Sequence, residues 1–421
     1  MSNDNPKTNY NIKLWIGKTD MSMHLNTVTI QVSKNHVFQK IFLNMGVNRT
    51  LYENNILPYK DRVKLDIICS KGSSSEDGTG DIDASFSYDL CIAEENGPTS
   101  LTSVTKDVPR SDSVTFTCVQ RNQLKQLQEI VKDLSFTECT RKQILDKIME
   151  KCPYVLQSKI ECESDTIDQI FLQPCRRFQA IRDLNNRIRL FAPPPIYINY
   201  CIDGKVYMGS CIKNELEPIK IYIGSETNDL EDITTSASKE NKNYDYSVIG
   251  SISQNINYDT TCISLGKNQK YCFFPMDSVF SKMEMNLNEY DDSYGLENTL
   301  GKDTKVSDHI KKTNYKETWV SKNGLPVIEG DSDKNKMFAQ NHIFEEINQA
   351  VTLSMALNGI IKFQDFLMVG RRVKITAGKS AERYTGDYFL DSATISFQEN
   401  GSYWSGGVHV VVKSSIKLGN C

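Results

Sequence analysis

Short runs that alternate between apolar and polar side chains dominate the first quarter of the chain. They lie at residues 14–16, 28–32, 63–67, 84–92 and 114–118. Successive side chains of a strand point to opposite faces, so a period of two predicts strands with one buried face. The segment 71–83 is rich in Gly, Ser and Asp, which predicts an exposed loop between two of these strands. Residues 1–118 are therefore expected to form an antiparallel β unit, a small barrel or sandwich.

Helical periodicity replaces this alternation after residue 118. Apolar residues at helical spacing predict a helix over residues 124–134, a second helix after a Thr140 cap and a third before the prolines at 193–195. Pro153 fits the end of the second helix. Short strands are expected at residues 196–200, 205–208 and 219–223. Residues 119–223 are therefore predicted to form an α/β insertion.

Two polar stretches, residues 225–243 and 286–335, are poor in apolar side chains and predict long surface excursions. A strand pair is expected between them, around residues 271–274. This β segment with its excursions covers residues 224–335.

The last segment, residues 336–421, is predicted to begin with a helix that ends near Gly359. The helix is indicated by an apolar stripe at Ile343, Phe344, Ile347, Val351 and Met355. Three strands at residues 370–375, 387–397 and 404–413 follow, joined by turn-rich segments, and predict an antiparallel meander. This meander would be a second β unit.

The two predicted β units share a sequence pattern. Residues 62–65 (Arg-Val-Lys-Leu) match residues 372–375 (Arg-Val-Lys-Ile). In each unit an aromatic strand containing aspartate follows, at residues 86–90 and 388–391, and then a β-branched strand, at 114–118 and 408–412. An internal repeat would explain the match, and chance is the competing explanation.

Composition excludes several classes of protein. The 421 residues carry a formal net charge of -4 and no long basic block, so the sequence shows no electrostatic footprint for nucleic acid. The N-terminal segment is polar, and no run approaches the roughly 18 apolar residues of a membrane span, so no membrane anchor is expected. The 12 cysteines include no C-x-x-C pair, which favours reduced thiols over disulfides or zinc.

Two motifs imitate ligand-binding loops. Residues 377–380 (Ala-Gly-Lys-Ser) end like a phosphate-binding loop, but Val373 occupies the position of its first glycine, so we expect a hairpin turn. Asp331, Asp333 and Asn335 match the first ligands of a calcium loop. Lys336 and His342 stand where that loop needs glycine and glutamate, so we expect a solvated polar loop instead.

Catalytic signatures are also missing from the sequence. The histidines occur in no zinc-hydrolase pattern; they are His24, His36, His309, His342 and His409. His409 alternates with valines and is expected to mark the polar side of a strand. A Cys–His pair remains arithmetically possible. The carboxylate pairs, Asp291 with Asp292 and Glu345 with Glu346, are expected to be surface charge.

The third predicted helix is basic. It carries or borders Arg176, Arg177, Arg182, Arg187 and Arg189. We expect a solvated face opposite the apolar stripe, with an acidic partner surface as the alternative. We assign no catalytic, cofactor-binding or metal-binding residue.

The order of these elements resembles the baseplate hub proteins of contractile-tailed phages and related contractile injection systems, including the base of the type VI secretion spike protein. The similarity is greatest over residues 343–418, in particular at 384–393 and 403–409. The resemblance implies an α+β, mainly β fold with two tube-forming antiparallel β-barrel-like domains and an inserted α/β region. It also implies a homotrimeric ring of pseudo-sixfold symmetry.

The function that this resemblance implies is structural. The ring would join the tail tube to the central spike and line a channel, with DNA only as transiting cargo. Its partners would be further copies of the chain, the tail tube protein, the spike protein and other baseplate proteins. It would lie in the virion tail and assemble in the host cytoplasm. Two alternatives stay open: a tail-associated cell-wall hydrolase or protease, and another tail component such as a tube, distal-tail or wedge adaptor.

Overall fold

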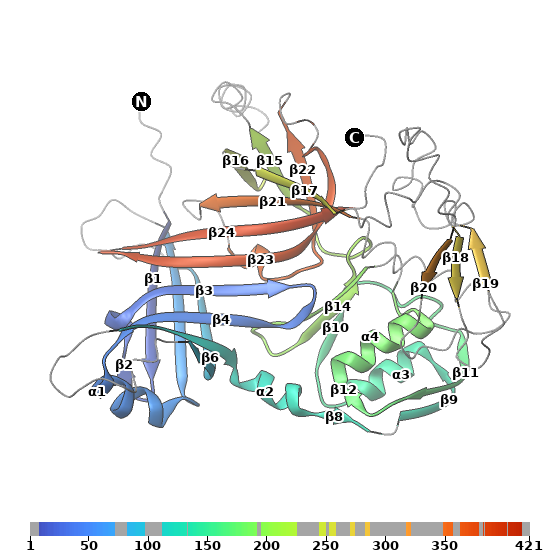
Figure 1. Ribbon diagram of the computed structural model, residues 1–421, viewed down its shortest axis with the longest axis horizontal. Helices are drawn as coiled ribbons and strands as arrows, with labels where there is room; N and C mark the ends of the chain where they lie inside the picture. Colours follow the sequence, from blue (N-terminus) through green and yellow to red (C-terminus); the bar gives the residue numbers. More distant parts are fainter. Residues whose placement is uncertain are drawn as a thin grey trace.

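The computed structural model describes β-strands throughout and few helices (Figure 1). The mainly β, α+β class predicted from the sequence is confirmed. The described residues are 8–71, 82–96, 112–132, 134–191, 195–224, 244–249, 252–257, 270–273, 283–286, 317–320, 348–356, 363–378, 382, 384–401 and 403–414.

Eight antiparallel strands close a barrel. Their order round the wall is β23 (Gly386–Asn400), β3 (Leu25–Ser33), β4 (His36–Val47), β7 (Asp112–Gln120), β6 (Ile82–Asn96), β5 (Val63–Lys71), β1 (Thr8–Ile16) and β24 (Tyr403–Ser414). Pairing of β23 with β24 completes the circle. The strands from residues 1–118 therefore need two C-terminal strands to close their barrel.

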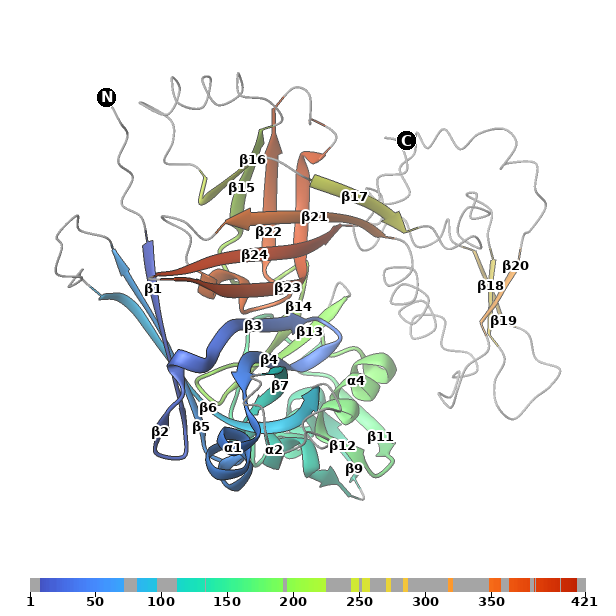
Figure 2. The same cartoon turned by 60° about the vertical axis from the view of Figure 1, so that its left-hand side comes forward.

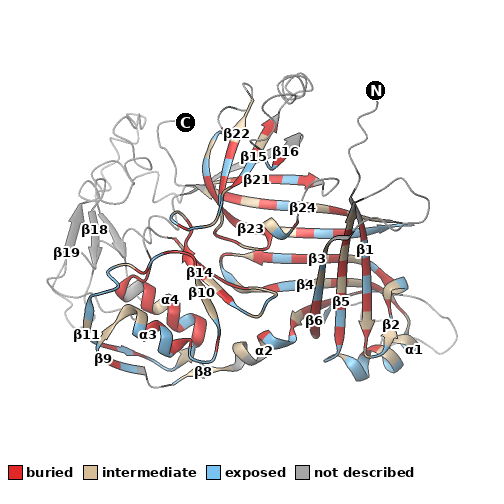
Figure 3. Cartoon of the chain, turned by 180° about the vertical axis from the view of Figure 1, so that it is seen from behind, coloured by how far each residue is buried: buried red, intermediate tan, exposed pale blue. Residues whose placement is uncertain are grey.

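Alternation of side chains accounts for the barrel core. Inward residues such as Leu14, Ile30, Leu43 and Phe116 are fully buried, while their neighbours along each strand face outward. Figure 3 shows this alternation as changes of colour along the strands. Strand β4 was not among the predicted strands, although it contributes Ile41, Leu43 and Met45 to the core.

The sheet continues beyond the barrel on both sides of the β23–β24 pair (Figures 1 and 2). Beside β23 lie β22 (Arg372–Ala377), β15 (Ile219–Gly224) and β16 (Tyr246–Ile249), and beside β24 lie β21 (Asn348–Ala356) and β17 (Ile252–Asn257). We call these seven strands, with β23 and β24 included, the extension sheet. It is not closed by strand pairing among the described residues, although β16 contacts β21. One closed barrel is thus present in the described chain.

A bulge lets β23 serve both parts of the sheet. The register shifts between Leu390 and Ser392. Before the bulge β23 pairs with β22, and after it β23 pairs with β3. Asp391 lies at the bulge, where its backbone carbonyl accepts from the amide of Lys34. Bulges bend strands, so this position allows one strand to leave the barrel wall and enter the extension sheet.

The insertion has a hydrophobic core of its own. Its elements are α2 (Arg121–Gln128), β8 (Ile130–Val131), β9 (Leu134–Thr140), α3 (Arg141–Ile148), β10 (Tyr154–Leu156), β11 (Thr166–Leu172), β12 (Cys175–Arg176), α4 (Arg177–Ile188), β13 (Ile196–Tyr200) and β14 (Val206–Ser210). The predicted cap on α3 is confirmed, because the Thr140 and Gln143 side chains form a capping box. The last strand predicted for this region, β15, belongs to the extension sheet instead.

Short elements and one small sheet complete the described chain. They are β2 (Thr19–Asp20), a 3-10 helix at Ser22–His24, α1 (Arg49–Leu51), a π-helix at Tyr52–Ile56, 3-10 helices at Leu57–Tyr59 and Phe363–Phe366, and the sheet β19 (Met283–Asn286), β18 (Lys270–Phe273) and β20 (Glu317–Val320). The strand predicted at residues 271–274 is confirmed over residues 271–273, where β18 pairs with β19, and Phe274 lies outside the described residues. The loop at residues 72–81 and the stretch 225–243 lie outside the described residues, as does most of 286–335.

The helix predicted from the stripe at residues 343–355 is wrong where the chain is described. Residues 348–356 form strand β21, in which Val351, Leu353 and Met355 are buried and Ser354 is exposed. Val351 and Met355 fit both a period of two and a period near four, so spacing alone does not separate strand from helix. The open edge of β24 decides in favour of the strand.

The helix predicted over residues 124–134 is also too long. Helix α2 ends at Gln128, and strands β8 and β9 follow. Ile130 and Val131 are β-branched, and this pair forms a two-stranded sheet with β12. Tertiary pairing therefore overrides the apolar spacing that predicted a continuous helix.

The two matching segments of sequence lie in corresponding meanders. Residues 63–65 lie at the start of β5, directly after Arg62; β5 pairs with β6, which pairs with β7. Residues 372–375 lie in β22, which pairs with β23, which pairs with β24. All four pairings are antiparallel.

Candidate assembly surface

One outer surface of the sheet runs without interruption from the extension sheet onto the barrel. In Figure 1, strands β21, β24, β23, β3 and β4 lie side by side in this order and form a single wall. Directly paired residues share a face, so the register places outward side chains in rows across the wall. We call four such rows the polar face: Thr352, Val411, Ser392, Ser33, His36; Ser354, His409, Thr394, Gln31, Lys40; Gly407, Ser396, Thr29, Phe42; and Ser405, Gln398, Thr27, Asn44, Thr115.

Hydrogen bonds join these side chains across neighbouring strands. Ser354 Oγ lies 2.9 Å from His409 Nδ1, and the hydroxyls of Thr29 and Ser396 lie 3.3 Å apart. Asn44 Nδ2 donates to Thr115 Oγ1 at 3.0 Å. These bonds hold the side chains close to the sheet. The expected role of His409, marking the polar side of a strand between buried valines, is confirmed.

The polar face carries very little charge. Asp, Glu, Lys and Arg make up 24% of the chain, yet Lys40 is the single member of that group in the four rows. Phe42 is the one aromatic side chain there, and it is partly exposed. The opposite wall of the barrel differs, because outward residues of β1 and β5 include Lys13, Lys64 and Asp66.

A buried joint fixes the insertion to the sheet. Asn199 Nδ2 donates to the carbonyl of Val369 at 2.8 Å, and Asn214 Nδ2 donates to that of Gly370 at 2.9 Å. Within the insertion, Tyr197 donates through its hydroxyl to Gln157 Oε1 at 2.6 Å. Buried polar groups with satisfied partners fix orientation as well as position. The insertion is therefore joined to the segment that leads into β22.

The insertion also contacts the β3–β4 turn at one end of the polar face. Arg182 Nη2 donates to the carbonyls of Lys34 and Asn35 at 3.3 and 3.0 Å. Phe38 packs against Phe178 and Tyr200, with ring centroids 5.3 and 5.5 Å apart. The turn end of these strands is thus covered by the insertion.

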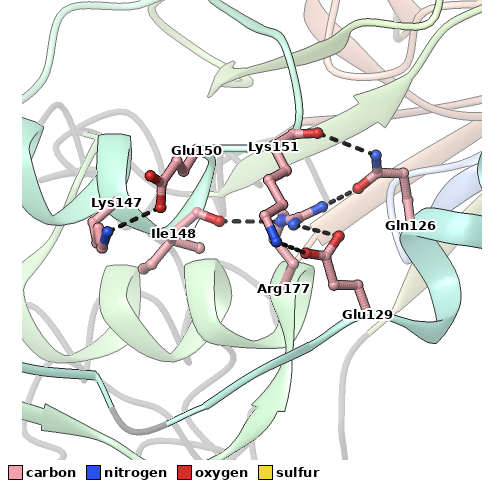
Figure 4. A network of polar contacts seen from close by, with 7 residues as sticks. All are labelled: Gln126, Glu129, Lys147, Ile148, Glu150, Lys151 and Arg177. Atoms are coloured by element: carbon pink, nitrogen blue, oxygen red, sulfur yellow. Dashed lines mark hydrogen bonds and ion pairs between the residues drawn. The ribbon is translucent and has the colours of Figure 1, made fainter.

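The predicted solvated basic face of the third helix is wrong for Arg177, which is buried in the polar network of Figure 4. Its guanidinium lies 2.7 Å from Glu129 Oε2, donates to the Ile148 carbonyl at 3.0 Å and contacts the Gln126 side chain. A buried guanidinium needs such partners, because an unpaired buried charge is strongly unfavourable.

A second arginine, directly after that helix, is internal as well. Arg189 is buried and lies 2.6 Å from Glu161 Oε2. The acidic partners of Arg177 and Arg189 thus come from the same chain. Arg176 is exposed as predicted, and the side chain of Arg187 lies outside the described residues. The spacing of residues in the sequence does not show which acidic side chain will pair with each arginine. The sequence therefore did not predict the ion pairs Arg177–Glu129 and Arg189–Glu161.

The phosphate-loop alternative fails on geometry. Val373 lies in β22 and is paired with Tyr388 of the antiparallel strand β23. Gly378 follows the end of β22. Lys379 and Ser380 lie outside the described residues, as do the calcium-loop positions Asp331, Asp333 and Asn335. The carboxylate pairs at residues 291–292 and 345–346 and the histidines His309 and His342 also lie outside them.

Four of the described cysteines are poor candidates for a nucleophile. Burial raises the pKa of the Cys201 thiol to about 12, and burial also raises the pKa values of Cys91, Cys118 and Cys152. The thiolate is the reactive form, so these groups are poor nucleophiles at neutral pH. The nine cysteines whose side chains the structure describes form no disulfide. No cluster of three or more His, Cys, Asp or Glu side chains in the described part of the chain could hold a metal ion.

Among the described helices, none combines the length and apolar character required to span a membrane.

Comparison with known proteins gives similarity in fold without similarity in sequence. No protein-family model matches the sequence, and no curated protein matches it. A tail protein from Neisseria meningitidis MC58 aligns with a TM-score of 0.54 at 12% identity, covering 98% of this chain and 99% of that one. The 43 kDa tail protein of prophage MuSo2 from Shewanella oneidensis aligns with a TM-score of 0.50 at 10% identity, covering 96% and 99%. Over nearly its whole length, the chain has the fold of phage tail proteins.

Proposed function

We propose that this chain is the structural hub of a phage-type contractile tail, and that it acts without catalysis. Three chains would form a ring that joins the tail tube to the central spike. The fold of phage tail proteins over almost the entire chain supports a tail component. The raised thiol pKa values, which leave the affected cysteines protonated at neutral pH, support a structural role over a cysteine-based hydrolase.

The polar face is the observation that carries this proposal. It extends over the barrel and the extension sheet through the shared strands β23 and β24. A wall that lines a channel for DNA must let the dense negative charge of the phosphates pass without binding the DNA tightly. Hydroxyl and amide side chains do so, because they neither repel phosphate nor bind it with salt-dependent strength. We therefore assign the polar face to the channel wall.

The extension sheet would be the second tube-forming unit of the subunit. Its seven strands curve far enough for β16 to contact β21, and only residues 250 and 251 separate β16 from β17 in sequence. The corresponding meanders β5–β6–β7 and β22–β23–β24 support two related units per chain. Two units in each of three chains would give the pseudo-sixfold ring that a sixfold tube requires.

The insertion at residues 119–223 would contact other baseplate proteins, and the segments 224–335 and 336–421 would add outer contacts and complete the ring. The insertion covers one end of the polar face through Arg182 and Phe38. The other end would then be free for a neighbouring ring. Assembly would take place in the host cytoplasm and yield a ring within the virion tail.

Averaged electron micrographs of the purified chain test this function directly. A hub predicts threefold rings with an open lumen, and light scattering at micromolar concentration should give the mass of a trimer. Sixfold rings would instead assign the chain to the tube. A well-behaved monomer at that concentration would contradict the proposal.

A further inference from the structure

We infer that the polar face is a contact surface for the phosphodiester backbone of DNA, with Lys40 as its charged contact. This inference rests on the proposed channel and adds the chemistry of its wall. The whole-chain charge of -4 gave no sign of it, because the relevant side chains come together only across strands.

Lys40 stands in the middle of β4 with an exposed side chain. No carboxylate among the described residues pairs with it, so its ammonium group is available to an external anion. In its row Lys40 lies beside Gln31, followed by Thr394 and His409 on the next strands. This row sets one cation in line with three hydrogen-bonding side chains across four strands.

The sign of the charge on this face is uniform. The ionisable side chains of the four rows are Lys40, His36 and His409, and none is a carboxylate. Asp391 lies buried at the bulge within β23 and Glu399 lies one residue before the end of that strand, both outside the rows, and Asp391 is paired with Lys413 at 3.2 Å. Such a surface is complementary to a polyanion.

The opposite wall shows that this arrangement is specific to one side of the barrel. There Lys64 Nζ lies 2.9 Å from Asp66 and 5.1 Å from the centre of the Trp15 ring. Lys13 is exposed but stands directly opposite Asp66 in the β1–β5 register. Cations on that wall are accompanied by an acid, whereas Lys40 is not.

Hydroxyl, amide and imidazole groups donate to phosphate oxygens without reading sequence. A single lysine per chain adds one phosphate contact, which gives weak attraction that falls with rising salt. This combination suits passage of DNA of any sequence, because each contact is easily made and easily broken. It also predicts that added positive charge on this face would hold the DNA.

The experiment measures binding of fluorescein-labelled random-sequence duplex DNA to the full chain by anisotropy over a series of salt concentrations. Lys40→Gln should weaken binding several-fold and make the slope of log affinity against log salt shallower by about one unit for each lysine removed from a contact. Thr394→Lys, in the same row, should strengthen binding several-fold. Lys13→Gln on the opposite wall is the matched control and should leave binding unchanged.

The outcomes separate this inference from the proposed function. Threefold rings that bind no DNA, or whose binding is unaffected by Lys40→Gln and lowered by Lys13→Gln, would overturn the phosphate contact and leave the hub intact. Failure of the chain to form rings would be seen in the micrographs, and it would contradict the proposed hub function only.

Discussion

Gly370 lies directly against the ring of Tyr197, so closely that a β-carbon at position 370 would overlap Tyr197 Cδ1. Its φ of 82° falls in the left-handed region, and its carbonyl accepts the bond from Asn214. Glycine is therefore required here for both space and backbone conformation. The contact joins the insertion to the segment that leads into β22.

We expect Gly370→Ala to lower the free energy of unfolding by about 2–4 kcal/mol, since it adds a steric clash to the left-handed backbone cost. Urea unfolding followed by tryptophan fluorescence measures the loss. Gly401→Ala is the matched control: its φ is 71°, but nothing lies within 4 Å of an added β-carbon, so only the backbone cost of about 1–2 kcal/mol should remain. Equal losses at the two positions would contradict the close packing.

Replacement of Arg177 by Met should destabilise the insertion by about 3 kcal/mol, because Glu129 and the Ile148 carbonyl would lose their partner. Glu129 keeps 33% side-chain exposure, which places the effect at the lower end for a broken buried pair. Arg176→Met, one residue away and exposed, should change the free energy of unfolding by less than about 0.5 kcal/mol. Chemical denaturation of both variants makes the comparison, and a neutral Arg177→Met would show the network to be dispensable.

Thr140→Ala should cost about 1 kcal/mol of stability, since the side-chain oxygen that caps α3 at the Gln143 amide is removed. Thr140→Ser keeps the hydroxyl and should remain close to the parent chain. Thermal unfolding followed by circular dichroism compares the two. A serine variant as unstable as the alanine variant would mean that the methyl group, and not the cap, is responsible.

Alkylation by iodoacetamide at pH 8 should spare Cys118 and Cys201 in the folded chain. Burial raises the pKa of both thiols, that of Cys201 to about 12, so at pH 8 they stay protonated and unreactive. Cys162 is exposed and should react first among the described cysteines. Peptide mass spectrometry with and without urea identifies the modified sites. Rapid labelling of Cys201 without urea would show that it is accessible after all.

The sequence predicted most of the regular structure where local signals agree. The strands around residues 28–32 and 114–118, the Thr140 cap and the C-terminal meander were all indicated by alternation or capping chemistry. Errors arose where one pattern fits two structures, as at Val351 and Met355, or where a paired strand replaces a helical turn, as at Ile130 and Val131. In each case the deciding interaction is a hydrogen-bonded edge contributed by a distant segment.

The candidate surface, like the fold, was predicted from the sequence only in part. His409 was correctly predicted to mark the polar side of its strand, but nothing in the sequence joined it to Lys40, which lies 369 positions earlier. The arginines at 177 and 189 had a visible charge, whereas their partners Glu129 and Glu161 are set by the packing of the insertion. Ion-pair partners at such separations follow from the fold and not from spacing.

The sequence by itself determined which side is buried in the strands that it predicted, because the period-two alternation of apolar residues admits one partition into core and surface. It also determined the helix ends marked by caps. Only the tertiary structure decided that β23 and β24 complete a barrel begun by the N-terminal strands, and that their outer residues continue the rows of β3 and β4. Strand pairing depends on backbone hydrogen bonds that every residue except proline can form, so the side chains specify a face but leave the neighbour to be selected by the packing of the whole chain.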